Sequence, residues 1–324
     1  MNSRERFVET MGYGRPDRVP YFHEGMQEEV INEWIKQGLP SDANLYEMFS
    51  FDYREEIEPD LEPHLWFKKW PKSKHELKRL KRAMDPNERG RLPKGWNRLI
   101  NKWRNRDYAL MLRVHRGFFL SMGVDGWRRF KEVSYLAIKD PKFVRETMRI
   151  QGEFAASLAE RALKDVEPDA AILVEPIAEN HGPLISPRMY EDLALKSYEP
   201  VLTVLKKCGV NTIIFLTFAN IRLLIPSILK WGFNCLWACE VSSKDMDYRD
   251  LRREFGRDLR LIGGIDLDVL RLDKEAIKKE IYEKVPPLLE KGGFVPLADG
   301  RVRADVPLEN YVYYRQLFEE VTRR

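Results

Sequence analysis

Acidic and amide side chains recur in this chain where apolar runs end. Such runs lie in the second half at 169–175, 211–217, 234–240, 260–266 and 293–299. A carboxyl group among apolar neighbours suits acid–base chemistry, because burial raises its pKa toward neutrality. The candidate site formed by these ends and the adjoining loops comprises Glu175, Glu179, Asn180, Thr217, Asn220, Glu240, Asp266 and Asp299.

The apolar runs must be held by elements that bring their polar ends together. Runs that are apolar throughout are typical of strands covered on both faces, and helix-like segments separate them here. This alternation predicts an α/β fold, a (β/α)8 TIM barrel whose site opens at the carboxyl ends of the strands. We expect one domain over residues 1–324, with residues 41–110 as a partly helical N-terminal cover over the barrel mouth.

The first half is less regular. We expect a helix at 3–11 capped by Asn2 or Ser3, and a long helix from Asp140 to Leu163 with Asp140 as its cap. The other expected elements are a strand at 19–22, a helix at 26–37, short strands at 51–53 and 65–69, a loop at 90–95 and a strand–helix element at 117–125.

Composition indicates an ordinary globular protein. The net charge is +4 and much of the positive excess lies between residues 68 and 106, among tryptophans. Such a stretch can bind nucleic acid or anionic ligands, but no known nucleic-acid module accompanies it. We therefore expect a solvated helical excursion that covers the barrel, or a lid that meets an acidic ligand, rather than a nucleic-acid site. Apolar runs stay shorter than the roughly 20 residues of a membrane span. We expect a soluble cytoplasmic protein that binds neither nucleic acid nor membrane.

Three cysteines provide no disulfide framework. Cys235 and Cys239 lie four residues apart in one apolar run and lack the setting of a zinc site. We interpret them as buried, inert thiols and expect no zinc, although a divalent metal held by carboxylates stays open.

Four strings resemble the uroporphyrinogen decarboxylase superfamily, which includes porphyrinogen decarboxylases and zinc-dependent, cobalamin-linked methyltransferases. They are Gly-Arg-Pro-Asp-Arg-Val-Pro at 14–20, Asn-His-Gly-Pro-Leu-Ile-Ser-Pro-Arg-Met-Tyr at 180–190, Leu-Ile-Gly-Gly-Ile-Asp at 261–266 and Asp-Val-Pro-Leu-Glu-Asn-Tyr at 305–311. The resemblance implies a (β/α)8 barrel. Together with the aromatic stretch at 311–314, which could also be buried within the barrel, it predicts a homodimer.

The chain departs from the superfamily's site patterns. Residues 23–27 read His-Glu-Gly-Met-Gln where the decarboxylases have Arg-Gln-Ala-Gly-Arg. Residues 217–220 replace the His-x-Cys of the methyltransferases, and 297–299 replace their last cysteine. The resemblance therefore implies a divergent member without the zinc and arginine signatures.

Roles follow from residue type and position. We expect Glu240, Asp299, Glu175 and His23 to be catalytic, and His115 to be structural. Expected substrate-binding residues are Glu24, Glu179, Asn180, His181, Thr217, Asn220, Asp266, Arg301 and Arg303. The alternatives are that Asp266 caps a helix, that Asp299 belongs to a simple turn and that the arginines pair with nearby acids.

Three functions remain open. The first is a methyltransferase or demethylase that passes a methyl group to a corrinoid partner, with no tightly bound cofactor of its own. The second is a decarboxylase-type lyase on a multi-carboxylate substrate, held by Arg301 and Arg303. The third is a catalytically silent ligand-binding barrel. For an active enzyme, Glu240 and Asp299 should face one pocket roughly 5–10 Å apart, with one of them protonated.

Overall fold

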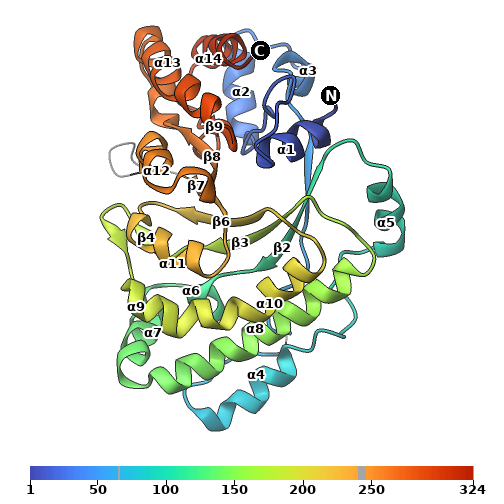
Figure 1. Cartoon of the computed structure of the whole chain (residues 1–324), viewed down its shortest axis with the longest axis vertical. Helices are drawn as coiled ribbons and strands as arrows, with labels where there is room; N and C mark the ends of the chain where they lie inside the picture. The colour runs from blue at the N-terminus through green and yellow to red at the C-terminus, as the bar shows by residue number, and fades with distance from the viewer. Residues whose placement is uncertain (65, 240–245, 324) are drawn as a thin grey trace. The chain divides into compact units, whose positions relative to one another are not determined.

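The computed structural model describes residues 1–64, 66–239 and 246–323. Strands and helices alternate along these residues, which confirms the α/β class (Figure 1). The chain divides into two compact units. Unit 1 comprises Met1–Glu55, Asp107–Ala109 and Cys235–Arg324, and unit 2 comprises Glu56–Arg106 and Leu110–Asn234. Each is described by itself, and a single domain stays a prediction.

Unit 2 is built on parallel strands. They are β2 (Ala109–His115), β3 (Ala170–Glu175) and β6 (Ile213–Phe218). In the register of β3 and β6, Glu175 lies opposite Thr217, so two predicted site residues meet at the carboxyl ends of neighbouring strands. A short antiparallel pair, β4 (Ala178–Glu179) and β5 (Gly182–Pro183), follows β3.

Helices surround these strands in unit 2. They are α4 (Leu77–Ala83), α5 (Trp96–Arg104), α6 (Phe118–Ser121), α7 (Trp127–Lys139), α8 (Pro141–Leu163), α9 (Pro187–Tyr190), α10 (Lys196–Lys207) and α11 (Ile225–Lys230), with short 3-10 turns at Lys74–Glu76 and Arg222–Leu224 and a π-helical turn at Glu191–Leu195.

The long helix α8 begins and ends where the sequence predicts. Asp140 is its N-cap and accepts a hydrogen bond from the Phe143 N–H at 3.0 Å, and Pro141 occupies the first helical position. Helix α10 packs along α8 (Figure 1). This close crossing requires Gly152, because a Cβ there would lie 1.8 Å from the Ser197 carbonyl oxygen.

Unit 1 contains a second set of parallel strands, β7 (Cys235–Cys239), β8 (Arg260–Ile265) and β9 (Phe294–Ala298). Beyond β9, Val302 forms a parallel bridge with Met26. The helices of this unit are α1 (Ser3–Met11), α2 (Glu28–Lys36), α3 (Leu45–Met48), α12 (Tyr248–Phe255), α13 (Lys274–Lys291) and α14 (Leu308–Thr322), with 3-10 turns at Gly256–Asp258 and Leu267–Arg271. All five apolar runs of the second half are therefore strands, as predicted.

The cap of α1 is decided in favour of Asn2. Its side chain accepts a hydrogen bond from the Glu5 N–H at 2.8 Å, and the Glu5 carboxylate accepts from the Asn2 N–H at 2.9 Å. This reciprocal pair is a capping box, which fixes the first turn of the helix.

The strand predicted at 19–22 is wrong. The Tyr21 N–H donates to the Asp52 carboxylate at 2.8 Å, and the Tyr21 carbonyl accepts from the Asp52 N–H at 3.0 Å. The backbone of Tyr21 is therefore hydrogen-bonded to a single residue and not to a neighbouring strand. The segment is apolar because Val19, Tyr21 and Phe22 are buried.

Other elements of the first half are shifted. The strand expected at 51–53 is β1 (Arg54–Ile57), and residues 66–69 form no strand, whereas Leu65 lies outside the described residues. The strand expected to begin near Gly117 is β2, which ends at His115 before α6. Helices α3, α4 and α5 confirm partial helicity within 41–110, and the role of this stretch as a cover stays a prediction. No described helix has the length and apolarity to cross a bilayer.

Candidate functional site

Asp299 is a buried carboxyl group at the carboxyl end of β9. Only 8 % of the residue is exposed, and its Oδ1 accepts a hydrogen bond from the Gly264 N–H at 2.8 Å. Its own N–H donates to the Ile265 carbonyl at 2.8 Å. Burial raises the pKa of Asp299 well above its ordinary value, outweighing the lowering by the Gly264 N–H and Lys284. Burial therefore favours the protonated form of Asp299, which can donate a proton.

Two consecutive glycines at the end of β8 make this placement possible. Gly263 and Gly264 have φ values of +109° and +87°, which other residues rarely adopt. A Cβ on Gly263 would lie 2.6 Å from the Asp299 Oδ1, and one on Gly264 would lie 2.7 Å from the ring of Tyr248. The glycines thus allow the carboxyl group to approach the backbone of β8.

Glu24 meets the end of β7. Cys239 donates its thiol to the Glu24 Oε1 at 3.7 Å, and the Arg54 guanidinium lies 3.7 Å from the Glu24 Oε2. Arg54 also lies over the Trp237 ring, 4.7 Å from its centroid. A carboxylate, a thiol and a guanidinium are therefore grouped beside β7.

His23 directly precedes Glu24 in the chain, and its neutral imidazole lies near the positive charges of Arg54 and Arg315. It stacks on Phe51 with 4.2 Å between ring centroids, and its Nδ1 accepts from the Gly25 N–H at 3.1 Å, which leaves the hydrogen on Nε2. Burial, and then the charges of Arg54 and Arg315, lower the pKa of His23 to about 4. The same charges would attract an anionic ligand. We use the name unit 1 site for the candidate residues of this unit, His23, Glu24, Arg54, Cys239 and Asp299, of which the contacts above connect the first four.

Glu175, at the end of β3 in unit 2, is the centre of a buried polar network. Its Oε2 accepts hydrogen bonds from the hydroxyls of Tyr190 at 2.8 Å and Tyr198 at 2.7 Å. Its Oε1 accepts from the Phe118 N–H at 2.8 Å. Burial raises the pKa of Glu175 to about 7, although all three donors act to lower it. Glu175 can therefore gain or lose a proton near neutral pH.

His115 adjoins this network. Its ring lies 4.5 Å from that of Tyr198, and its Nδ1 accepts from the Gly117 N–H at 3.0 Å. Its Nε2 is buried with no hydrogen-bond partner in the described structure. Burial lowers the pKa of His115 to about 3, so the ring is neutral. We call Glu175, Tyr190, Tyr198 and His115 the Glu175 network.

The comparisons with known proteins place the chain in a family. The sequence model described as "Uroporphyrinogen decarboxylase (URO-D)" matches residues 120–313, more than half of the chain. The chain belongs to the uroporphyrinogen decarboxylase family. This match includes the strings at 180–190, 261–266 and 305–311, whereas the one at 14–20 lies outside it.

The other comparisons add little about this family member. A uronate isomerase from Bacillus halodurans C-125 is similar at 14 % identity and a TM-score of 0.37, with 77 % of this chain and 60 % of that chain covered. This chain therefore spans about three-fifths of the length of that isomerase. No curated protein matches the chain.

The remaining predicted site residues of this URO-D chain occupy varied settings. Thr217 donates its hydroxyl to the Glu175 carbonyl at 2.8 Å. Glu179, Asn180 and His181 are exposed on the β4–β5 turn, and the Glu179 carbonyl accepts from the Asn220 N–H at 3.2 Å. Unit 2 thus groups Glu175 with Thr217, and the turn with Asn220.

Asp266 and the two arginines belong to the loops after β8 and β9. Asp266 caps the turn Leu267–Arg271 by accepting from the Asp268 N–H at 2.9 Å, which is the structural alternative. Arg303 is exposed and pairs with the Asp268 carboxylate at 2.7 Å, and Arg301 is also exposed. Glu240, the first catalytic candidate, lies outside the described residues.

Sequence reasoning missed Arg54, Tyr190 and Tyr198 as site residues. The tyrosines flank the π-helical turn Glu191–Leu195, a type of element that often occurs at functional sites but has no sequence signature. Arg54 stands in an ordinary acidic stretch, Arg-Glu-Glu, which is typical of a solvated surface. No local signal distinguishes it.

The described residues do not fit a zinc ion. No three His, Cys, Asp or Glu side chains among them are grouped closely enough to hold a metal. Burial raises the pKa of the Cys235 thiol to about 12, whereas zinc binds the thiolate. No step below is derived through zinc.

Proposed function

We propose that this URO-D family member is a methyltransferase that removes a methyl group from an O-, N- or S-methyl donor bearing a negative charge. The observation that carries the proposal is the carboxyl group of Asp299, which is buried at the end of β9 against the Gly264 N–H and whose pKa is raised by that burial. A departing alkoxide, amide ion or thiolate takes up a proton to become the neutral alcohol, amine or thiol, and a neutral carboxylic acid can supply it. We further propose that the parallel strands belong to a (β/α)8 barrel, whose site lies at the strand carboxyl ends.

Each residue of the unit 1 site has a part in this scheme. Asp299 donates a proton to the leaving heteroatom. His23, neutral and with its hydrogen on Nε2, orients the donor by a hydrogen bond. Arg54 supplies positive charge for the donor's anionic group, and Glu24 holds Arg54 on one side. The aromatic neighbours of His23, such as Phe51, suit a donor with a flat apolar body.

The methyl group needs an acceptor. A corrinoid carried by a partner protein would supply a strongly nucleophilic metal centre for this purpose. Because the partner holds that group, this chain needs only to expose the bound donor and requires no cofactor of its own.

A decarboxylase is the second candidate. The observation that favours it is the positive environment of His23, created by Arg54 and Arg315, which suits a carboxylate substrate. Loss of carbon dioxide leaves an electron pair on carbon, and Asp299 would protonate that carbon. Arg303 does not suit the proposed grip on a multi-carboxylate, because it pairs with Asp268 on the surface.

The test supplies free reduced cobalamin as acceptor and a panel of methylated small molecules, each with and without a carboxylate. Cobalamin methylation is followed by absorbance and carbon dioxide release by gas analysis. We expect methylation with carboxylated donors, and a rate lowered by about 10²–10⁴-fold in Asp299→Asn, because the amide cannot donate an acidic proton. The matched control is Asp268→Asn, an exposed carboxylate of the same unit.

Other outcomes separate the candidates. Full methylation activity in Asp299→Asn would refute its role as the acid. Carbon dioxide release without methylation would favour the decarboxylase. Binding of panel compounds with neither reaction would support a silent ligand-binding barrel.

A further inference from the structure

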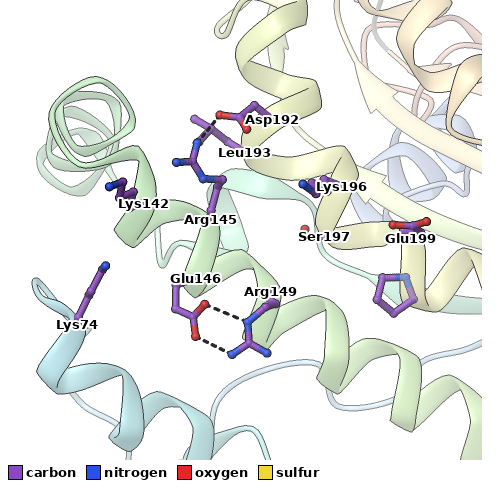
Figure 2. A pocket seen from close by; sticks show the side chains of 11 residues that line it. Lys74, Lys142, Arg145, Glu146, Arg149, Asp192, Leu193, Lys196, Ser197 and Glu199 are labelled. Carbon is purple, nitrogen blue, oxygen red and sulfur yellow. Dashed lines mark hydrogen bonds and ion pairs between the residues drawn. The ribbon is translucent and has the colours of Figure 1, made fainter.

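A hollow lies on the helical surface of unit 2, apart from the residues of the Glu175 network. It has a volume of about 520 Å³ and is bounded by the turn Lys74–Glu76, the start of α8 and the segment from Asp192 to Pro200 (Figure 2). A second hollow of about 520 Å³ adjoins it along α4 and shares Lys74, Lys142, Glu146 and Arg149. This volume suits a small molecule rather than a flat protein surface.

Basic side chains outnumber acidic ones in the lining of both hollows, with five basic and three acidic residues around the first. Around the second hollow there are five basic residues, namely Lys74, Lys78, Lys81, Lys142 and Arg149, and one acidic residue, Glu146. Arg149 is already neutralised, since it forms two hydrogen bonds with Glu146, at 3.0 and 2.6 Å. The four lysines form no ion pair within the described residues, so their charges are available to a ligand.

The first turn of α8 adds to this positive field. It contains Lys142 and no acidic residue, and Arg145 follows within the next turn. Basic residues near a helix N-terminus are unfavourable, because they face the positive end of the helix dipole. Arg145 is held by Asp192 at 2.6 Å (Figure 2), whereas Lys142 has no such partner. A bound anion would relieve this repulsion.

The floor of the two hollows is apolar. Buried Leu77 and Ile150 line the second hollow, and Leu193 and Pro200 line the first. A ligand here would meet lysines and, beside them, the buried side chains of Leu77, Ile150 and Leu193.

We infer that these hollows bind a small molecule carrying two or three linked phosphate groups. The lysines of the two hollows outnumber the three lining acids, of which Glu146 and Asp192 already pair with Arg149 and Arg145, and a tripolyphosphate chain supplies negative charges in a compact volume. Lysine is a common phosphate ligand, because its compact charge does not require a planar partner. The chemistry is shared by free polyphosphate and by a nucleoside polyphosphate, whose base would lie on the apolar floor. The inference goes beyond the proposed function and uses none of its residues.

Calorimetric titration at low salt tests it with inorganic tripolyphosphate, adenosine triphosphate, orthophosphate and a single-stranded DNA oligonucleotide. We expect one tripolyphosphate per chain, bound far more tightly than orthophosphate. Lys74→Ala with Lys142→Ala should weaken binding at least about tenfold, because each loses a charged hydrogen bond. Tighter binding of adenosine triphosphate would identify a nucleotide as the source, and equal or weaker binding would identify free polyphosphate.

The matched control is Lys206→Ala with Lys207→Ala, which removes the same charge from exposed positions at the end of α10. Equal weakening in both double variants would overturn the inference, because binding would then reflect net charge alone. Several tripolyphosphates per chain, or a preference for the oligonucleotide, would overturn it as well. Far-UV circular dichroism verifies that each variant is folded.

Discussion

In the Glu175 network, burial raises the pKa of Glu175 and lowers the pKa of His115, because in both residues it favours the neutral form. Glu175 is raised to about 7 from 4.5, so between these values it carries a proton in the folded state that the unfolded chain lacks. Its contribution to stability therefore falls as pH rises through that window. His115 is lowered to about 3 from 6.5, so its contribution is lost as pH falls below 6.5. The two effects offset each other where the windows overlap.

Glu175→Gln should expose this compensation. The glutamine side chain does not titrate, whereas Glu175 must stay protonated in the folded wild type while the unfolded chain ionises. The stability of the wild type should therefore fall relative to that of Glu175→Gln as pH rises. The difference in unfolding free energy should change by about 2 kcal/mol between about pH 5 and pH 6.5, at 1.36 kcal/mol per pH unit. Urea unfolding of both proteins across this range measures it.

Glu160→Gln is the control, since Glu160 is exposed on α8 in the same unit. It should show no comparable pH-dependent difference from wild type. A pH-independent difference for Glu175→Gln would mean that Glu175 is ionised throughout the range.

The raised pKa of Asp299 has a physical cause within the described residues. A raised pKa was expected for one member of a close pair with Glu240. Burial is the largest cause of the raised pKa of Asp299, with smaller contributions from Asp266 and Glu280. The spacing of the pair and the effect of Glu240 on this pKa stay predictions, because Glu240 lies outside the described residues.

At the scale of elements, the packing of α8 against α10 depends on a glycine, Gly152, at the point where the two helices cross. Gly152 lies in the middle of α8, where glycine weakens a helix. It is required because the Ser197 carbonyl would lie 1.8 Å from any Cβ at that position. The same helix α10 carries Tyr198 to Glu175, so this crossing also sets the position of a donor in the Glu175 network.

Gly152→Ala should therefore destabilise the protein despite the better helix propensity of alanine. Overpacking of this kind costs about 1–3 kcal/mol, more than the helix gain of roughly 1 kcal/mol. Chemical denaturation measures the change. The control is Gly126→Ala, since a Cβ at Gly126 meets no atom within 4 Å and its φ of 172° is open to any residue. Equal stability of the two variants would show that α8 and α10 can move apart freely.

At the scale of the whole molecule, the basis for the homodimer has changed. Tyr311 and Tyr314 are each 2 % exposed, and Tyr311 packs on Trp34 and Phe49 within unit 1. The aromatic C-terminal stretch is thus part of the unit's own core, the alternative that the sequence left open. Val312 and Tyr313 are half-buried, and the homodimer stays a prediction that rests on the resemblance to the family.

We expect light scattering at micromolar concentration to give a mass of about twice the 38.3 kDa of the chain. Dilution should lower the mass toward that of one chain if the dimer is weak. A mass near 38.3 kDa at every concentration would contradict the dimer. The corrinoid partner and the cytoplasmic location stay predictions.

The sequence alone determined the strands of the second half and the α/β class. Runs that are apolar throughout can be stable only when both faces are covered, so their period and length suffice to identify them. Local chemistry likewise located the cap Asp140 and limited the cap of the first helix to Asn2 or Ser3, because a cap interacts with residues two or three positions away. The family strings were recognisable for a related reason, since each is contiguous.

Only the tertiary structure decided which side chains meet. Arg54 approaches Glu24 and Trp237, and Tyr190 and Tyr198 approach Glu175, over separations that no local pattern encodes. The apolar segment at 19–22 failed as a strand for the same reason, because a distant residue, Asp52, satisfies its backbone. Protonation was also beyond the sequence, since the pKa values of Glu175, His115 and Asp299 are set by burial, which depends on the packing of the whole unit.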